Sequence, residues 1–155
     1  MTARSKISEM QTRGLRLLVA IDFSPHSLRS LRAARKVRQR IGGTVTVLHV
    51  RPPSDVRAAV VEERGDLVKS PNLRKAMADH YRTRLDALVG GRAGESWKIR
   101  SGKPAVEIAR EGRRGYDLVV AGTRGAGAAA RLLLGSTVQE LLQSSPIPVV
   151  VVPAR

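Results

Sequence analysis

The chain has 155 residues, of which 42% are hydrophobic and only 3% are aromatic, so it is long enough for one domain with an aliphatic core. It contains no cysteine, which excludes disulfides, thiolate metal sites and cysteine nucleophiles, and its scattered histidines lack the spacing of a zinc site. An excess of 28 Lys and Arg over 13 Asp and Glu gives a net charge of +15, which favours phosphate-bearing partners such as nucleotides, nucleic acids or anionic lipids.

The chain begins with a polar segment that precedes the first predicted strand. Residues 1–14 lack the apolar stretch of a secretory signal and are expected to form a flexible basic tail. The apolar run at 15–21 predicts a buried strand. Ser24 followed by Pro25 then predicts the cap and the first residue of a helix that continues to about residue 40.

This first helix has two predicted faces of opposite character. The apolar face is expected to hold Leu28, Leu31, Ala34, Val37 and Ile41. The other face holds Arg29, Arg32, Lys36 and Arg40. Because the basic face has no acidic partners in the helix, it is either a solvent-facing surface or a docking surface for an acidic protein, a nucleic acid or a membrane.

The middle of the chain contains one clear strand, one ambiguous segment and one clear helix. β-Branched residues at 44–50 predict the second strand. The segment 54–69 is ambiguous, with Ser54 able to cap a short helix that Gly65 would end. A long amphipathic helix then starts at Pro71 and ends at a glycine pair. Its apolar stripe consists of Leu73, Met77, Tyr81, Leu85 and Leu88.

The C-terminal half continues the alternation of strands and helices. A strand is expected at 97–100, a helix from Pro104, a strand at 117–121, a helix at 136–143 and a last strand at 147–152.

This alternation predicts an α/β fold. We expect a single Rossmann-like domain at residues 15–155, a three-layer sandwich with helices on both faces of a mainly parallel five-stranded sheet in the order 3-2-1-4-5. Ligands of such sheets bind beyond the carboxyl ends of the strands, where the strand order reverses. That edge would carry Asp22 after the first strand and Gly122 after the fourth.

A glycine pattern follows the fourth predicted strand and leads into a helix. It reads Gly122-x2-Gly125-x9-Gly135-Ser136-Thr137. Glycines at a strand end and hydroxyl residues at a helix start allow backbone N–H groups to face an anion. The alternative is structural, with the glycines serving a turn and Ser136 forming a capping box with Gln139. Asp22 has a similar alternative, in which it holds the loop before the first helix.

The motifs together resemble the universal stress protein family, specifically its nucleotide-binding branch, over roughly residues 15–153. The resemblance is carried by residues 19–24, Leu48-His49-Val50, Gly102-x-Pro104, residues 117–122 and the glycine pattern through Ser136. It implies that ATP lies across the loops after the first and fourth strands. Asp22 would then contact the ribose and adenine end, which Ala20 and Ile21 would line, and Val50 would border the adenine pocket.

The same resemblance implies a phosphate site built mainly from backbone. Its residues would be Gly122, Thr123, Arg124, Gly125, Gly135, Ser136 and Thr137. Arg124 and Arg131 either add charge-assisted hydrogen bonds to a triphosphate or are solvated loop charges. Mg²⁺ or Mn²⁺ would be carried by the phosphates, because no protein cage for a metal is evident.

Function is expected to follow from nucleotide occupancy. The resemblance implies a cytoplasmic, ATP-binding regulatory protein of the stress response, and an apolar edge strand at Val149–Val152 predicts a homodimer.

One alternative is a slow or partner-dependent ATPase, for which Arg124 would stabilise charge but only Asp22 is available to position water. The other alternative is a nucleotide-free scaffold that docks acidic partners through its basic face. No run of apolar residues approaches the length of a membrane span.

Overall fold

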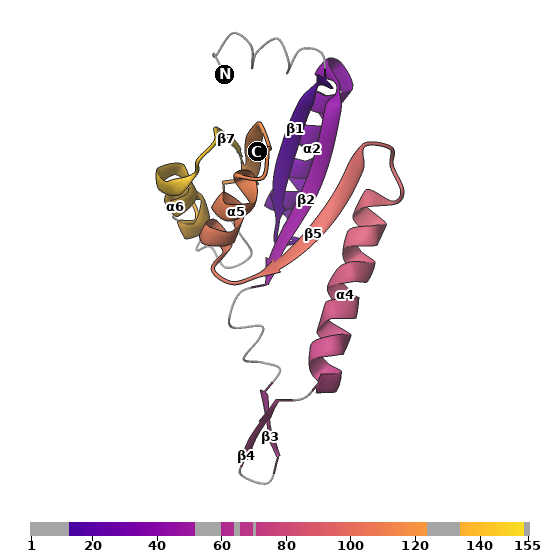
Figure 1. Cartoon of the computed structure of the whole chain (residues 1–155), viewed down its shortest axis with the longest axis vertical. Coiled ribbons are helices and arrows are strands. Elements are labelled where there is room, and N and C mark those ends of the chain that lie inside the picture. The colour runs from indigo at the N-terminus through magenta and orange to yellow at the C-terminus, as the bar shows by residue number, and fades with distance from the viewer. Residues whose placement is uncertain (1–12, 52–59, 64–65, 70, 124–133, 154–155) are drawn as a thin grey trace.

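The main sheet is parallel throughout and has the predicted strand order. The computed structural model describes residues 13–51, 60–63, 66–69, 71–123 and 134–153. The strands are β1 (Leu15–Ile21), β2 (Gly43–Arg51), β5 (Glu95–Ser101), β6 (Leu118–Gly122) and β7 (Val149–Val152). They are arranged β5-β2-β1-β6-β7 (Figure 1), so the single α/β domain and its 3-2-1-4-5 order are confirmed.

Two pairs of helices cover the two faces of this sheet. The helices are α2 (Pro25–Ile41), α4 (Pro71–Val89), α5 (Pro104–Gly112) and α6 (Ser136–Ser144). Three of them begin with proline, whose missing N–H is not needed in a first helical turn. Within the described part of the chain, none of the helices is long and apolar enough to cross a membrane.

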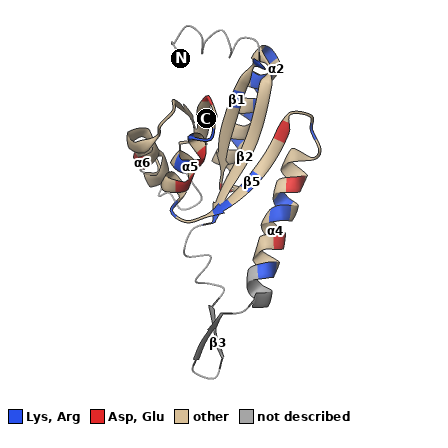
Figure 2. Cartoon of the chain, in the orientation of Figure 1, with Lys and Arg blue, Asp and Glu red and all other residues tan. Residues whose placement is uncertain are grey.

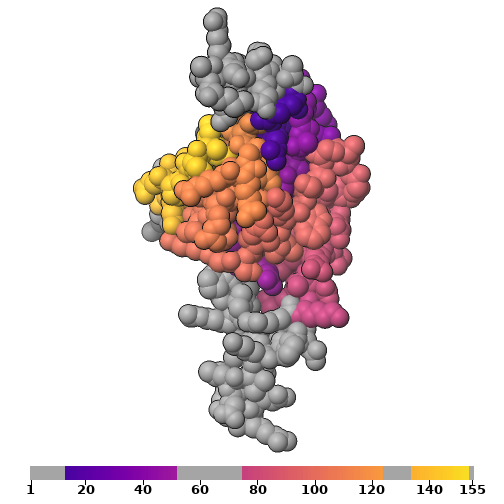
Figure 3. Space-filling model, in the orientation of Figure 1, coloured from indigo at the N-terminus to yellow at the C-terminus, as the bar shows by residue number. Residues whose placement is uncertain are grey.

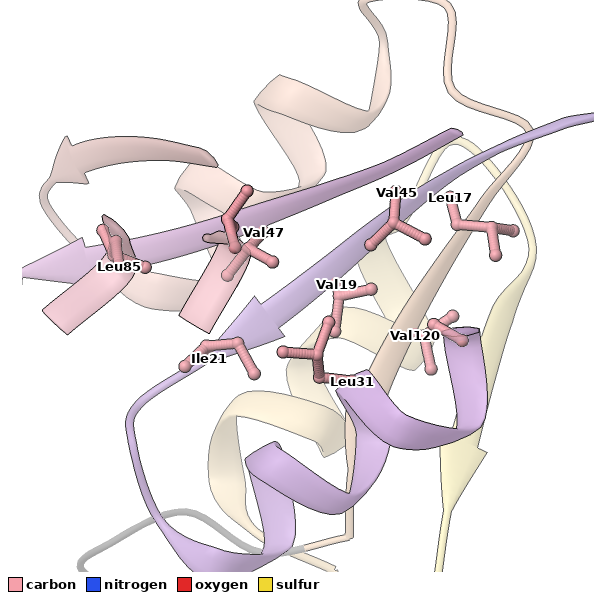
Figure 4. Packing of buried hydrophobic residues seen from close by; sticks show 10 residues of the cluster. Leu17, Val19, Ile21, Leu31, Val45, Val47, Leu85 and Val120 are labelled. Carbon is pink, nitrogen blue, oxygen red and sulfur yellow. The ribbon is translucent and has the colours of Figure 1, made fainter. Parts of the chain in front are cut away.

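The core lies in two layers, one on each side of the sheet. On the side of α2 and α4 it is aliphatic, and Figure 4 shows Leu31 of α2 beside Val19 of β1, with Leu85 of α4 on the same side of the sheet. On the other side, Ile108 of α5 and Leu141 of α6 pack against β1, β2 and β6. In the space-filling view α5 and α6 form one continuous surface (Figure 3).

The buried face of α2 differs from the predicted one. Leu31 and Ala34 are buried as expected, but Val37 and Ile41 are 40% and 53% exposed, and Ser27 and Ser30 are buried in their place. The serines can be buried because the helix itself satisfies their hydroxyls: Ser27 Oγ donates to Ser24 O at 3.0 Å and Ser30 Oγ donates to His26 O at 3.2 Å. The small side chains also allow α2 to approach the sheet closely.

The short helix that was expected in the ambiguous segment is wrong for the residues described there. Those residues form an antiparallel hairpin of β3 (Val60–Glu63) and β4 (Asp66–Lys69), in which Val61 pairs with Val68. β-Branched residues fit a strand better than a short helix, and cross-strand pairing outweighed the capping signal. Ser54 and Gly65, which carried the helix prediction, lie outside the described residues.

Candidate functional site

The predicted site residues that the structure describes lie at the carboxyl edge of the parallel sheet. Val19 pairs with Val120, Ile21 pairs with His49, and Gly122 pairs with Val152, so β1, β2, β6 and β7 end at this edge. β1 continues into α2 on one face of the sheet, whereas β6 leads to α6 on the other face. This is the point at which the strand order reverses, and ligands of open α/β sheets bind there.

Asp22 is an exposed residue that also holds the turn into α2. Its Oδ1 accepts a hydrogen bond from Ser24 N at 3.0 Å, and its own N–H donates to Ser27 Oγ at 3.3 Å. Ser24 then caps the helix, with Oγ accepting from Ser27 N at 3.2 Å. The loop-holding interaction is therefore present, and it fixes the carboxylate at the edge of the sheet where a ligand would lie.

The three apolar residues predicted to line the adenine end do not share one face. Ile21 is only 4% exposed and belongs to the core on the side of α2, while Val50 belongs to the core on the side of α5 and α6. Ala20 packs on the same side as Val50. Ile21 contributes its backbone at the edge, where its carbonyl oxygen accepts a hydrogen bond from His49 Nδ1 at 2.8 Å.

The end of β6 is tightly packed and is linked to the start of α6. A Cβ added at Gly122 would lie 3.0 Å from both the carbonyl carbon and the oxygen of His26, so any side chain there would require the start of α2 to move by a few tenths of an ångström. Thr123 O accepts a hydrogen bond from Gly135 N at 2.7 Å. Thr123 Oγ1 is buried and has no hydrogen-bond partner among the described residues. Arg124 and Gly125 lie outside the described residues.

The first turn of α6 has no side-chain cap, contrary to the capping-box alternative. The N-cap is Gly135, no side-chain cap bond is formed, and Ser136 is the exposed first residue of the helix. Gln139 Nε2 instead donates to Leu134 O at 3.3 Å. The N–H groups of a first helical turn have no acceptor within the helix, and the helix dipole makes this end positive. The structure thus presents backbone donors and the hydroxyls of Ser136 and Thr137 at one place.

An aromatic cluster that sequence reasoning missed supports the turn carrying Asp22. Phe23 has a positive φ of 64°, and its ring centroid lies 4.8 Å from that of His49, which is 4.4 Å from that of Tyr81. The guanidinium of Arg84 lies 3.9 Å from the centroid of the Phe23 ring. These contacts join the β1–α2 turn to α4 and hold Phe23 in a backbone conformation that non-glycine residues rarely adopt. Because the chain has so few aromatic residues, their positions could have drawn attention to this cluster. The sequence alone does not show that they meet, since they are far apart along the chain.

Asp117 is an ionic anchor at the opposite edge of the sheet. Burial by itself would raise the pKa of its carboxyl, but hydrogen bonds from Arg13 at 2.8 and 3.0 Å and from Arg16 N at 2.8 Å outweigh burial, and the pKa is lowered. Asp117 immediately precedes β6, so this cluster lies at the amino edge and has no part in the site. It attaches Arg13 to the sheet, while residues 1–12 of the expected tail lie outside the described residues.

Comparisons with known proteins agree on a single family. The model of the universal stress protein family matches residues 15–153. The chain is 31% identical over 139 residues to the universal stress protein in the QAH/OAS sulfhydrylase 3′ region of Thermus aquaticus. This alignment covers 88% of this chain and 96% of that protein.

Solved structures show the same fold. The hypothetical protein MJ0577 superposes with a TM-score of 0.75 at 21% identity, over 90% of this chain and 96% of that one. A universal stress protein in complex with cAMP superposes with a TM-score of 0.53 at 26% identity, over 89% of this chain and 96% of that one. From the match over residues 15–153 and the relative in Thermus aquaticus, the chain belongs to the universal stress protein family.

Proposed function

We propose that this chain binds ATP across the carboxyl ends of β1 and β6 and acts as a regulatory module that responds to nucleotide occupancy. The observation that carries the proposal is the uncapped first turn of α6, held against the end of β6 by the 2.7 Å hydrogen bond from Gly135 N to Thr123 O. An uncapped helix start with free backbone donors suits a phosphate group. The complex of a related universal stress protein with cAMP supports an adenine nucleotide as the ligand.

The proposed binding arrangement assigns each part of the nucleotide to one part of the edge. The exposed carboxylate of Asp22 takes the ribose hydroxyls, since a carboxylate oxygen is an acceptor for such groups. Ala20 and Val50, which share one face, border the adenine together with the backbone of Ile21. The phosphates take the donors of Ser136 and Thr137, and the buried hydroxyl of Thr123 supplies one more. Arg124 and Gly125 remain proposed contacts by family resemblance.

A divalent cation fits this proposal as a companion of the phosphates. Among the described residues, no group of three or more His, Asp or Glu side chains converges as a metal site would require. Mg²⁺ is usually held by substrate phosphates and one or two carboxylates and keeps several of its waters. We therefore propose that Mg²⁺ or Mn²⁺ is bound through the triphosphate.

A calorimetric titration with MgATP tests the site through Ser136. The wild type is expected to bind, and Ser136→Ala is expected to weaken binding about 10-fold or more, because a hydrogen bond to a charged phosphate contributes roughly 1.5–3 kcal/mol. Ser136 is exposed and caps nothing, so the variant keeps its fold. Ser144→Ala is the matched control, since Ser144 lies at the far end of the same helix and its Oγ donates only to Glu140 O at 2.8 Å.

The same titration separates the proposal from its two alternatives. Absence of heat with millimolar MgATP would contradict nucleotide binding and favour the scaffold. Equal affinities of the Ser136 and Ser144 variants would mean that the Ser136 hydroxyl does not contact the phosphates. Phosphate release by the wild type that Asp22→Ala abolishes would indicate an ATPase rather than a binding module.

We also propose that β7 pairs with its counterpart in a second copy. β7 is the last strand in the sheet order, its four residues are all valine, and Val150 is 46% exposed. An apolar edge strand is a surface for strand pairing, which a lysine opposes. We expect light scattering at micromolar concentration to give a dimer for the wild type and a monomer for Val150→Lys, with unchanged circular dichroism. A monomeric wild type would contradict the proposal.

A further inference from the structure

The outer face of α2 carries an uncompensated row of positive charge. Helix α2 contains six basic residues and no acidic residue. Arg35 and Arg38 turn to the buried carboxylate of Glu95, with nitrogen–oxygen distances of 2.6 and 3.4 Å. The four remaining cations make no hydrogen bond or ion pair with any other described residue, and we call them the α2 basic row. They are Arg29, Arg32, Lys36 and Arg40.

The geometry of this row is regular and rigid. Its members are three or four residues apart, so they lie on one side of the helix, opposite the buried Leu31 and Ala34. From Arg29 to Arg40 the row spans about 16 Å, with about 4.5–6 Å between successive members. Arg32, Lys36 and Arg40 are exposed, and Arg29 is half-buried. Figure 2 shows α4 carrying charges of both signs, whereas only basic residues colour the visible part of α2.

We infer that the α2 basic row is a docking surface for the phosphate backbone of duplex nucleic acid. A duplex carries about one negative charge per 1.7 Å of its axis with both strands counted, so the three exposed cations of a row about 16 Å long can lie along a dense array of phosphates. Contacts of this kind position a protein on the duplex without reading its sequence. The net charge of +15 adds long-range attraction to the same partner.

The composition of this face favours nucleic acid over an acidic protein or a lipid surface. Protein interfaces are centred on buried aromatic or apolar anchors, and the row has none between its cations. Helices that lie in a membrane surface insert a broad apolar face. The apolar face of α2 is packed on the sheet, and only Val37 and Ile41 are exposed beside the row. The row also lacks aromatic residues for stacking on unpaired bases, which points to a duplex rather than a single strand.

Salt-dependent binding of a labelled duplex, without any nucleotide present, tests this inference independently of the ATP site. The wild type is expected to bind duplex DNA at about 50 mM salt and to weaken steeply as salt rises. The triple variant Arg32→Gln, Lys36→Gln and Arg40→Gln is expected to bind at least about tenfold more weakly there. The slope of log affinity against log salt should fall by about 2.7, since each phosphate contact contributes about 0.9. Glutamine keeps the helix propensity of the replaced residues.

A second triple variant removes the same charge from other places. Lys75, Arg82 and Arg113 are exposed and lie outside α2, and their change to glutamine lowers the net charge equally. We expect this control to bind duplex nearly as well as the wild type. Equal weakening by both triples would assign binding to overall charge and overturn the inference, as would no duplex binding by the wild type. The same two triple variants can be measured with polyglutamate and with phosphatidylserine vesicles. If the α2 triple variant loses more affinity for either of these than for duplex, the choice of partner is overturned.

Discussion

A Gly122→Val variant is expected to lose about 2–3 kcal/mol of unfolding free energy, because the new side chain has no room at the end of β6. Its Cβ would lie 3.0 Å from both the carbonyl carbon and the oxygen of His26. Those atoms belong to the backbone of the first turn of α2, so they cannot move aside as a flexible side chain would. Urea denaturation monitored by circular dichroism measures the loss.

Gly112 provides the matched control for this prediction. A Cβ at Gly112, the last residue of α5, would meet side chains alone: Ile147 at 3.3 and 3.4 Å and Pro146 at 3.9 Å. Side chains of this kind can shift more easily than the backbone of a helix. We therefore expect Gly122→Ala to be clearly less stable than Gly112→Ala. Equal stability of the two alanine variants would mean that α2 shifts easily and that the packing argument is wrong.

This packing changes how the glycine pattern should be tested. The sequence interpretation gave Gly122 the role of letting the backbone approach a nucleotide, so its replacement by valine would abolish binding. Because the same substitution disturbs the packing of α2, a loss of binding in that variant would not locate the ligand. Ser136 is the better probe, since its side chain is exposed and the helix does not depend on it.

A Glu111→Gln variant is expected to lose about 2–3 kcal/mol at neutral pH, because a buried acceptor for several cations is weakened. The Glu111 side chain is only 1% exposed, and its oxygens accept from Lys98 Nζ at 2.6 Å and from Arg100 Nη2 at 2.8 Å. Arg114 lies 3.5 Å away. Glutamine keeps the size of the side chain but removes the charge that these cations share.

The pH dependence of stability should change in the same variant. Burial alone would raise the pKa of Glu111, but the hydrogen bonds from Lys98 and Arg100 outweigh it and the pKa is lowered. The stabilisation from this carboxylate is therefore complete above its unfolded pKa of about 4.3 and is lost as the pH falls through the lower folded value. The pKa of Asp117 is also lowered, so its contribution to the free energy of unfolding is likewise lost as the pH falls. The Glu111→Gln variant should lose less stability than the wild type between neutral and acidic pH.

Glu140→Gln is the control for this second prediction. Glu140 forms an exposed bridge with Lys103 at 2.8 Å, and exposed bridges contribute about 0–1 kcal/mol. If urea denaturation at neutral and acidic pH gives the same curves for the two glutamine variants, the cluster around Glu111 does not contribute as the structure indicates.

Local signals in the sequence were sufficient for the sheet and for most helix boundaries. The Ser24-Pro25 pair marked the start of α2, since a serine hydroxyl followed by a proline favours that turn whatever its surroundings. Apolar runs marked the strands, because a strand covered on both faces has no polar alternation to obscure it. The strand order followed from the alternation of strands and helices and from the expected reversal point.

Contacts between distant segments were beyond the reach of such signals. The burial of Ser27 and Ser30 depends on hydroxyls that bond to their own helix, while helical spacing alone favoured Val37 and Ile41. Gly135 rather than Ser136 is the cap of α6, and its N–H donates to Thr123 O, a contact between residues distant in the sequence. The placement of the described site residues on one edge was therefore predictable, but the contacts of their individual side chains were not.

The hydrogen bond from Gly135 N to Thr123 O has a consequence for how this part of the chain can vary. It fastens the two ends of the intervening stretch to each other, so insertions and deletions between them need not displace β6 or α6. Doubling the length of a closed loop adds only about 0.6 kcal/mol of entropy cost. The fastening therefore separates the positions of β6 and α6 from the length of the chain that connects them.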